Sequence, residues 1–254
     1  MKNKMEDYTK YKGEGIARIT EQDNVNKLSD IERILIDKGC DRKLVKSIIK
    51  AELERDKIEC NNPYRSWNDG QTLEVVSLIG AYLGSFLDKK ILDIGCGATK
   101  GGDAVPPNIS YLLSHLGAKV DGIDLAPYDG NVYTHFQANL LEEDLIKVLG
   151  KGKEYNAIIA SNFFSSPALH KEVDKSKSQS KDNFSIRLIS QIYDLLKKKG
   201  LLIVDPFPVI PFHGKKDKEC VVKTEEILRS IGFRNITKDT TFNEKYSGIY
   251  LKGN

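Results

Sequence analysis

The sequence predicts an α/β fold, in which an N-terminal helical cap precedes a doubly wound, mostly parallel sheet of seven strands. Three observations predict this fold. Apolar residues recur at helical spacing before residue 60, short β-rich runs alternate with amphipathic segments after Lys90, and polar residues join two final β-rich runs. Such alternation indicates parallel strands covered by helices on both faces. We expect the final two runs to form an antiparallel pair at one edge.

The N-terminal part is expected to be helical. Apolar residues recur every three or four positions over 28–58, with a break at Gly39-Cys40-Asp41 that is typical of a helix end followed by an Asp N-cap. This pattern predicts a helical hairpin. A further helix is expected from about residue 69 or 70 to residue 86. We therefore divide the chain into a cap segment, 1–68, and a larger domain, 69–254.

Helical segments lie between several of the five β-rich runs that predict the parallel part of the sheet. The strands are expected at 91–94, 118–123, 131–136, 155–160 and 201–204. The helices are expected at 109–116, 184–196 and 224–230, and the last two strands near 233–237 and 248–251. Residues 171–181 are too polar to be buried, and we expect a mobile surface loop there.

The composition excludes several classes of protein. With 40% apolar residues it fits a globular chain, and 39 Lys+Arg against 36 Asp+Glu give a net charge of +3, too small to indicate nucleic acid or an anionic membrane as a partner. No apolar run approaches the roughly 18 to 20 residues of a membrane span, and no secretory signal is recognisable, so a cytoplasmic protein is expected. The four cysteines lack metal-site spacing, and no metal is expected.

A glycine loop at the end of the first strand gives the strongest functional signal. The run Ile91-Leu92-Asp93-Ile94-Gly95-Cys96-Gly97 ends on an acid and two glycines, and the second strand ends on Asp124. Glycines carry no side chain and can adopt positive φ, so a ligand can approach the backbone closely. The carboxylate of Asp124 can accept hydrogen bonds from both hydroxyls of a ribose.

Two kinds of nucleoside cofactor use an acid in this position. A dinucleotide fingerprint, G-x-G-x-x-G, would place its third glycine where Lys100 stands, and Asp93 would set an anion close to a pyrophosphate. S-adenosylmethionine has no phosphate and carries a sulfonium cation and an ammonium group, which suit a carboxylate at Asp93. The charge pattern therefore favours S-adenosylmethionine.

From about residue 90 to residue 254, the chain resembles the class I S-adenosylmethionine-dependent methyltransferases, which are Rossmann-like proteins. Their first strand ends approximately in D/E-x-G-x-G-x-G and their second in an acid. The resemblance implies that Gly95 and Gly97 line the methionine portion, Asp124 binds the ribose, Leu125 covers one adenine face, and Asn139-Leu140 meets the adenine edge. The candidate cofactor-binding residues are Asp93, Gly95, Cys96, Gly97, Asp124, Leu125, Asn139, Leu140, Ser161 and Arg65.

The sequence departs from the family pattern in two ways. Thr99 replaces the third glycine, and 27 positions (124 − 97) separate Gly97 from Asp124, about seven more than the roughly 20 expected. The surplus lies in residues 99–107, whose prolines prevent a helix from starting before about Asn108. This enlarged loop either shapes a ligand pocket or is a surface excursion.

The methyl acceptor is expected beyond the carboxyl ends of the fourth and fifth strands. His170 and His213 follow these strands and are the better-placed candidates for a catalytic base, although a lone His carries no mechanism. Structural roles are expected for His115 and His135. Four aromatic residues either line an apolar pocket or, as is more frequent, belong to the core: Phe163, Phe164, Phe207 and Phe212.

The segment before the predicted domain also offers candidates. Arg65 could pair with the methionine carboxylate, and Tyr64 and Trp67 could wall the site. Alternatively, Trp67 anchors the hairpin against the main domain.

Together these expectations favour an enzyme that transfers a methyl group to a small-molecule acceptor. The cap, the enlarged loop and the aromatic segments could enclose a compact pocket. The alternatives are methylation of RNA or protein, for which the lysines at 197–199, 215 and 216 are too few to decide, and a non-catalytic methyltransferase-like binding domain. The sequence does not predict an oligomeric state.

Overall fold

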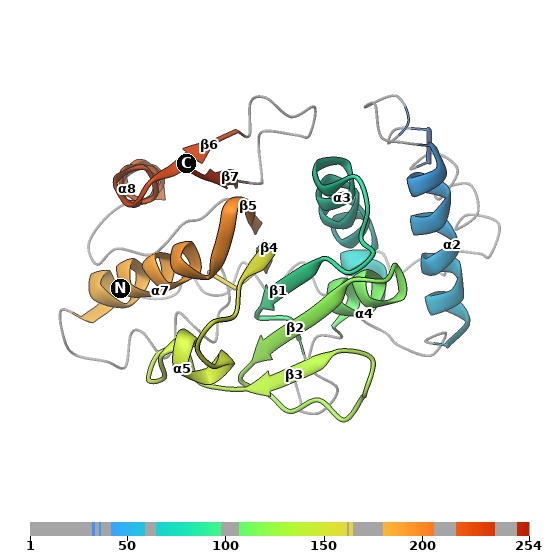
Figure 1. Cartoon of the computed structure of the whole chain (residues 1–254), viewed down its shortest axis with the longest axis horizontal. Coiled ribbons are helices and arrows are strands. Elements are labelled where there is room, and N and C mark those ends of the chain that lie inside the picture. The colour runs from blue at the N-terminus through green and yellow to red at the C-terminus, as the bar shows by residue number, and fades with distance from the viewer. Residues whose placement is uncertain are drawn as a thin grey trace, which may run out of the picture.

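A computed structural model shows a central sheet with helices on both faces (Figure 1). The structure describes residues 32–33, 36, 42–58, 65–97, 107–161, 163–164, 180–205, 217–236 and 248–253. The expected hairpin and the enlarged loop therefore lie partly outside the described residues. Four candidate residues lie wholly outside them: His170, His213, Phe207 and Phe212.

Seven strands form one sheet in the order β3-β2-β1-β4-β5-β7-β6. Their bounds are β1 (Lys90–Ile94), β2 (Lys119–Asp124), β3 (Thr134–Gln137), β4 (Tyr155–Ser161), β5 (Leu196–Asp205), β6 (Phe233–Asn235) and β7 (Gly248–Lys252). The first five strands pair in parallel, and β7 is antiparallel to both of its neighbours, β5 and β6. The predicted Rossmann-like fold class, with its antiparallel C-terminal pair, is confirmed.

The helices form a layer on each face of the sheet. They are α2 (Arg42–Ile58), α3 (Arg65–Leu83), α4 (Asn108–His115), α5 (Leu145–Leu149), α7 (Ser180–Leu195) and α8 (Asp217–Ile231). On one face α3 and α4 cover the sheet, and α2 contacts both of them from outside (Figure 1). On the other face lie α5, α7 and α8. Among the helices that the structure describes, none combines the length and the hydropathy of a membrane-spanning segment.

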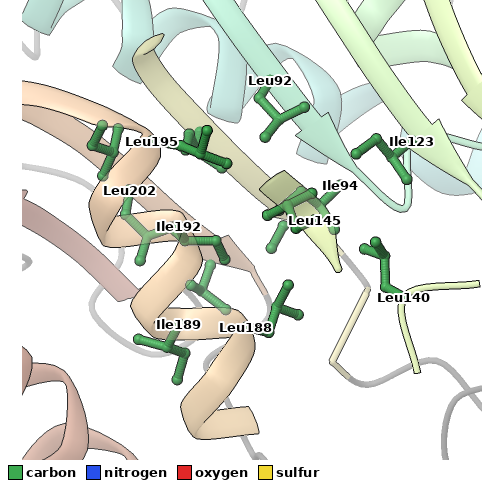
Figure 2. Packing of buried hydrophobic residues seen from close by; sticks show 14 of the residues in the cluster. Leu92, Ile94, Ile123, Leu140, Leu145, Leu188, Ile189, Ile192, Leu195 and Leu202 are labelled. Atoms are coloured by element: carbon green, nitrogen blue, oxygen red, sulfur yellow. The ribbon is translucent and has the colours of Figure 1, made fainter. Parts of the chain in front are cut away.

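The alternation of side chains along the strands creates two separate cores. Ile91 of β1 and Val120 of β2 face α3 and α4, whereas Leu92 and Ile94 face the opposite layer. In that second core, α7 presents a stripe of apolar side chains to the strands at the helical spacing that one buried face requires (Figure 2). The stripe consists of Leu188, Ile189, Ile192 and Leu195.

The strand order reverses between β1 and β4. From β1 the chain proceeds through β2 to β3 on one side, and it then crosses over to β4 and β5 on the other side. Ligands of doubly wound sheets bind outside the carboxyl ends of the strands at such a reversal. The ends of β1, β2 and β4 therefore position the candidate site.

Several element boundaries differ from those expected. Helix α3 begins earlier and ends at Leu83, because Gly84 adopts φ +71 and donates its N–H to Gly80 O, which terminates the helix before the expected residue 86. Strand β5 begins at Leu196, five residues before the expected start. Of the expected loop 171–181, the last two residues belong to α7, and 171–179 lie outside the described residues.

The short helix α5 is absent from the sequence-based expectation. Its N-cap, Asp144, accepts the N–H of Lys147, and Gln191 of α7 supports both Asp144 and the buried N–H of Leu145. A helix of five residues shows too little periodicity to be recognised, and its stability comes from these caps and from tertiary contacts.

The expected division of the chain between 68 and 69 falls within α3. Because α3 also packs on the sheet, the cap and the larger domain share this helix. The division itself stays a prediction.

Candidate functional site

The loop after β1 turns sharply over the end of β2. Gly95 and Gly97 have φ values of +72 and +92, in the left-handed region that favours glycine. The N–H groups of Gly95 and Cys96 both donate to the carbonyl of Ile123, at 2.8 and 3.1 Å. A Cβ atom at Gly95 would lie 2.9 Å from the ring of Phe163, so a side chain there would force Phe163 to move. The predicted glycine loop is therefore a tight turn in which two of the three residues, Gly95 and Gly97, carry no side chain.

Asp124, at the end of β2, is bound to this loop. Its Oδ2 accepts the N–H of Gly97 at 2.9 Å, and its Oδ1 accepts the N–H of Ala126 at 3.0 Å. A carboxylate offers about four lone-pair sites, so each oxygen can still accept a further hydrogen bond. The backbone thus fixes the orientation of the carboxylate that the sequence assigns to a ribose.

Asp93, on β1, is a buried carboxyl group on the same face of the sheet. Its side chain is 1% exposed, and its Oδ2 accepts the hydroxyl hydrogen of Ser110 at 2.7 Å. Burial raises the pKa of Asp93 to about 7; the Ser110 hydrogen bond opposes this rise, and the negative charge of Asp124 adds to it. When Asp93 is ionised, the two acids create a region of negative potential around the glycine loop.

Ser110 was not identified from the sequence. It is fully buried in the first turn of α4, which begins at Asn108, as the prolines predict. Its partner Asp93 lies 17 positions earlier, and no local pattern marks the pair. Of the enlarged loop, Pro107 is the N-cap of α4, and 99–106 lie outside the described residues.

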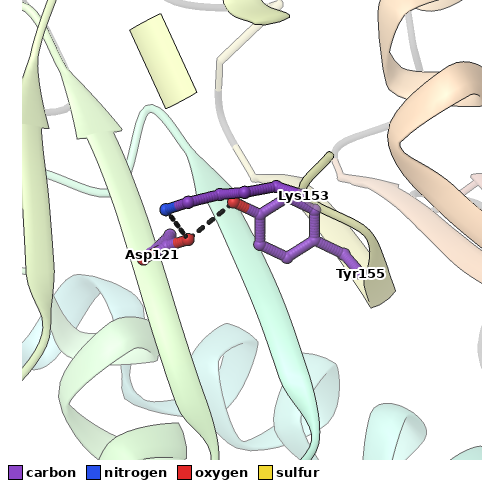
Figure 3. Close-up of polar contacts among 3 residues, drawn as sticks. All are labelled: Asp121, Lys153 and Tyr155. Atoms are coloured by element: carbon purple, nitrogen blue, oxygen red, sulfur yellow. Dashed lines mark hydrogen bonds and ion pairs between the residues drawn. The ribbon is translucent and has the colours of Figure 1, made fainter. Parts of the chain in front are cut away.

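The second acid of β2 has a separate, structural role. Asp121 lies three positions before Asp124, so its side chain points to the opposite face of the sheet. Its Oδ2 accepts hydrogen bonds from Lys153 Nζ at 2.7 Å and from Tyr155 OH at 2.6 Å (Figure 3). This cluster ties β2 to β4 across β1 and leaves Asp124 as the acid of β2 that faces the glycine loop.

The turn after β2 presents the candidates for binding an adenine base. Leu125 is 56% exposed, which is unusual for a leucine directly after a buried strand. The N–H of Ala138 donates to Asp124 O at 3.0 Å and thus brings the end of β3 beside this turn. Asn139 follows; its Oδ1 accepts the N–H of Leu141 at 3.2 Å, and its own N–H donates to Glu143. The side chain of Leu140 belongs to the core, so only its backbone can meet a ligand.

The thiol of Cys96 is buried in the core. Its Sγ lies 3.7 Å from both Tyr133 OH and His135 Nδ1, within the core between the sheet and α4. Burial raises the pKa of this thiol, so it stays protonated. A ligand can therefore meet position 96 only through its backbone. Among the residues that the structure describes, no group of His, Cys, Asp and Glu could hold a metal ion.

The end of β4 contributes residues from the predicted acceptor side. Ser161 is buried and pairs in register with Asp205 of β5. Phe163 lies against Gly95 and contacts Phe164 edge to face, with ring centroids 5.2 Å apart. Phe164 is buried in the core, in line with the more frequent role of such aromatics. Phe163 is thus the described aromatic that touches the glycine loop.

The remaining candidates are placed only in part. Arg65 is the first residue of α3, but its side chain lies outside the described residues. The two histidines expected to be structural have backbone partners: His115 Nδ1 lies 2.8 Å from Tyr111 O, and His135 Nε2 lies 3.1 Å from Ala126 O. Their structural roles are consistent with this geometry.

Comparisons with known proteins find similarity among solved structures only. No family model and no curated protein matches the chain. The structure is similar to a TehB-like SAM-dependent methyltransferase from Corynebacterium glutamicum, with 14% identity, a TM-score of 0.42, and coverage of 76% of this chain and 100% of that chain.

Two further solved structures illustrate the range of similar proteins. A didemethyltoxoflavin methyltransferase from Burkholderia thailandensis, bound to 1,6-didemethyltoxoflavin and S-adenosylhomocysteine, has 14% identity and a TM-score of 0.44 over 82% of this chain and 89% of that chain. A fibrillarin pre-rRNA processing protein from Methanococcus jannaschii has 14% identity and a TM-score of 0.41 over 66% and 68%. The similar proteins thus include a methyltransferase bound to a small molecule and a pre-rRNA processing protein.

Proposed function

We propose that this chain binds S-adenosylmethionine at the carboxyl ends of β1 and β2 and transfers its methyl group to a small-molecule acceptor. One observation carries the proposal: two carboxylates, Asp93 and Asp124, flank a tight glycine loop on one face of the sheet. A cation near this pair is favoured, whereas an anion such as a pyrophosphate is repelled.

Each part of the cofactor has a candidate partner. Asp124 is oriented to accept hydrogen bonds from the two ribose hydroxyls, and the exposed side chain of Leu125 offers an apolar surface to one adenine face. Asn139 stands at the adenine edge, after β3. Asp93 provides negative charge for the sulfonium and ammonium groups, directly or through water. Arg65 stays a candidate for the methionine carboxylate.

The bound cofactor would supply an activated methyl group on a sulfonium leaving group. The protein then has mainly to align the acceptor atom in line with the methyl carbon. Phe163 lies between the glycine loop and the end of β4, and it would form an apolar wall where the acceptor approaches. A base is required only if the acceptor loses a proton; His170 and His213 stay the candidates for that role.

An acceptor of small size is favoured by this aromatic wall and by the modest net charge. A bulky RNA acceptor would require a continuous basic surface, and the chain has only three more basic than acidic residues. RNA or protein methylation, and cofactor binding without catalysis, are the outcomes that a panel of acceptors would separate from this proposal.

Titration calorimetry tests the cofactor assignment. We expect S-adenosylmethionine and S-adenosylhomocysteine to bind and NAD not to bind. Asp124→Ala should weaken both nucleosides, because both contain the ribose. Asp93→Asn should weaken S-adenosylmethionine more than S-adenosylhomocysteine, because only the former carries the sulfonium charge. Binding of NAD in place of both nucleosides would refute the proposal.

A further inference from the structure

We infer that His135, on β3, is a positioning residue: it holds the Leu125–Ala126 turn and thereby sets the affinity of the site for the adenosine part of its ligand. The inference rests on the proposed function. It deepens that proposal, because it assigns a role to a residue that contacts the turn carrying Leu125 and not the ligand itself.

The turn after β2 is held at three polar atoms. His135 Nε2 lies 3.1 Å from the carbonyl oxygen of Ala126, and Asp124 Oδ1 accepts the N–H of Ala126 at 3.0 Å. Gln137, two residues further along β3, donates from Nε2 to the carbonyl of Leu125 at 3.2 Å. Side chains of β3 therefore bind both carbonyl groups of the turn, and Asp124 binds its N–H.

The partners of His135 determine its tautomer. A carbonyl oxygen can only accept, so Nε2 must carry the hydrogen that is donated to Ala126. When Nδ1 carries no hydrogen it can accept from Tyr133 OH, which lies 3.4 Å away. Cys96 Sγ lies 3.7 Å from the same nitrogen and donates to Gly97 O at 3.4 Å. The imidazole of His135 thus contacts the Leu125–Ala126 turn through Nε2 and lies beside Cys96 of the glycine loop through Nδ1.

The turn depends on such contacts because it begins a long irregular connection. Between the end of β2 and the start of β3, residues 125–133 form no helix or strand. The ring of His135 lies 5.5 Å from that of Tyr128, which stacks on Tyr133 at 4.5 Å, so the connection folds back on the histidine. Without the His135 bond, Leu125 would sample other positions, and the ligand would bind only the competent fraction.

Binding measurements with adenosine, S-adenosylmethionine and S-adenosylhomocysteine test the inference. His135→Leu removes the donor, and we expect the Kd of all three ligands to rise together by about tenfold, the loss expected if one tenth of the molecules keep a competent turn. The ratio of the S-adenosylmethionine and S-adenosylhomocysteine affinities should not change, because the carboxylate of Asp93 is untouched. General loosening of the site would alter this ratio.

Matched substitutions provide the controls. His115→Leu removes another imidazole that bonds to a backbone carbonyl, on the last residue of α4, and should leave all three affinities unchanged. His135→Gln retains an amide donor near Nε2 and should restore affinity to within about twofold, whereas the shorter His135→Asn cannot reach Ala126 and should not.

The outcomes separate the inference from the proposed function. If the wild-type protein binds none of the three ligands, the proposed function fails. If the wild type binds them and His135→Leu binds adenosine equally well, the positioning role is wrong and the proposed function stands. Should His135→Leu fail to fold, equal affinities of His135→Gln and His135→Asn would overturn the inference.

Discussion

At the scale of single residues, Asp93 has the most unusual environment. Its carboxyl group is almost completely buried, accepts one hydrogen bond from a hydroxyl group and lies close to a second acid. Ionisation of such a group is costly. A binding site for a cation gains from such a group, because the ligand charge compensates the ionised form. The burial of Asp93 lowers the stability of the ligand-free protein and is therefore consistent with a role in binding.

The raised pKa of Asp93 predicts a specific dependence of stability on pH. Between about pH 4 and 7 the folded chain holds a proton that the unfolded chain releases, so the free energy of unfolding falls as pH rises through this window. The decrease in the free energy of unfolding that Asp93 causes is at most about 1.4 kcal/mol per pH unit. Urea unfolding of the wild type and Asp93→Asn from pH 4 to 8 should show this fall in the wild type only.

Asp88→Asn is the matched control for that experiment. The Asp88 carboxylate pairs with Lys119 at 2.7 Å, which lowers its pKa, so its own contribution changes only at lower pH. This variant should keep the wild-type slope between pH 4 and 7. Identical slopes for the wild type and Asp93→Asn would contradict the assignment.

Gly95 predicts a substitution that affects both folding and binding. In Gly95→Ala, the left-handed φ costs about 1 kcal/mol, and the clash with Phe163 adds to this cost. Gly84→Ala is the matched control, since Gly84 has nearly the same φ, +71, but has open space at its Cβ. Thermal unfolding should therefore show a larger loss for Gly95→Ala, and only this variant should weaken nucleoside binding.

The two site carboxylates and the glycine loop are recognisable from the sequence, whereas their supports are not. Asp93, Gly95, Gly97 and Asp124 follow strand-like runs at a spacing that local chemistry explains. Ser110 and His135 act on atoms that lie 17 and nine positions away along the chain. Such contacts depend on how α4 and β3 dock on the sheet, and single residues carry no signal of that docking.

At the scale of elements, the contact between α2 and α3 depends on one glycine. A Cβ at Gly80 would lie 2.8 Å from Leu44 of α2 and 2.9 Å from Phe86, so the absence of a side chain permits the close approach of the helices. Gly80→Val should destabilise the protein by about 1–3 kcal/mol. Ala81→Val, at an exposed neighbouring position, should cost well below 1 kcal/mol, and equal losses in chemical unfolding would contradict this account.

The sequence predicts buried elements better than exposed or short ones. Strands β1 and β4 agree with expectation to within one residue, because most of their residues are apolar and buried. The predicted start of β5 is five residues late, because Lys197, Lys198 and Lys199 interrupt the apolar pattern in the first part of the strand. The position of β7 between β5 and β6 was not expected, since local pattern does not encode which strands become neighbours.

At the scale of the whole molecule, the cap helix and the sheet share one core. Val45 and Ile48 of α2 are fully buried in the same cluster as Ile91 and Ile159 of the sheet. We therefore predict a single calorimetric unfolding transition, in which the calorimetric and van't Hoff enthalpies agree. Two separate transitions would show that the cap unfolds independently of the sheet.

Ligand binding should raise the midpoint temperature of this single unfolding transition. At 100 times its Kd, S-adenosylmethionine should stabilise the protein by about 2.7 kcal/mol, which corresponds to a rise in Tm of several degrees. Asp124→Ala should abolish the shift at the same ligand concentration. A shift that persists in this variant would place the ligand elsewhere on the molecule.

The reversed strand β7 has a consequence for biosynthesis. The outer edge of β5 pairs with residues 248–251 of β7, more than 40 positions downstream of the end of β5 at Asp205. While the ribosome is producing the intervening segment, this edge of a nascent sheet lacks its neighbour and can pair with other chains. Completion of the sheet must therefore wait until translation has passed β7, so a chain that stalls before that point exposes an aggregation-prone edge.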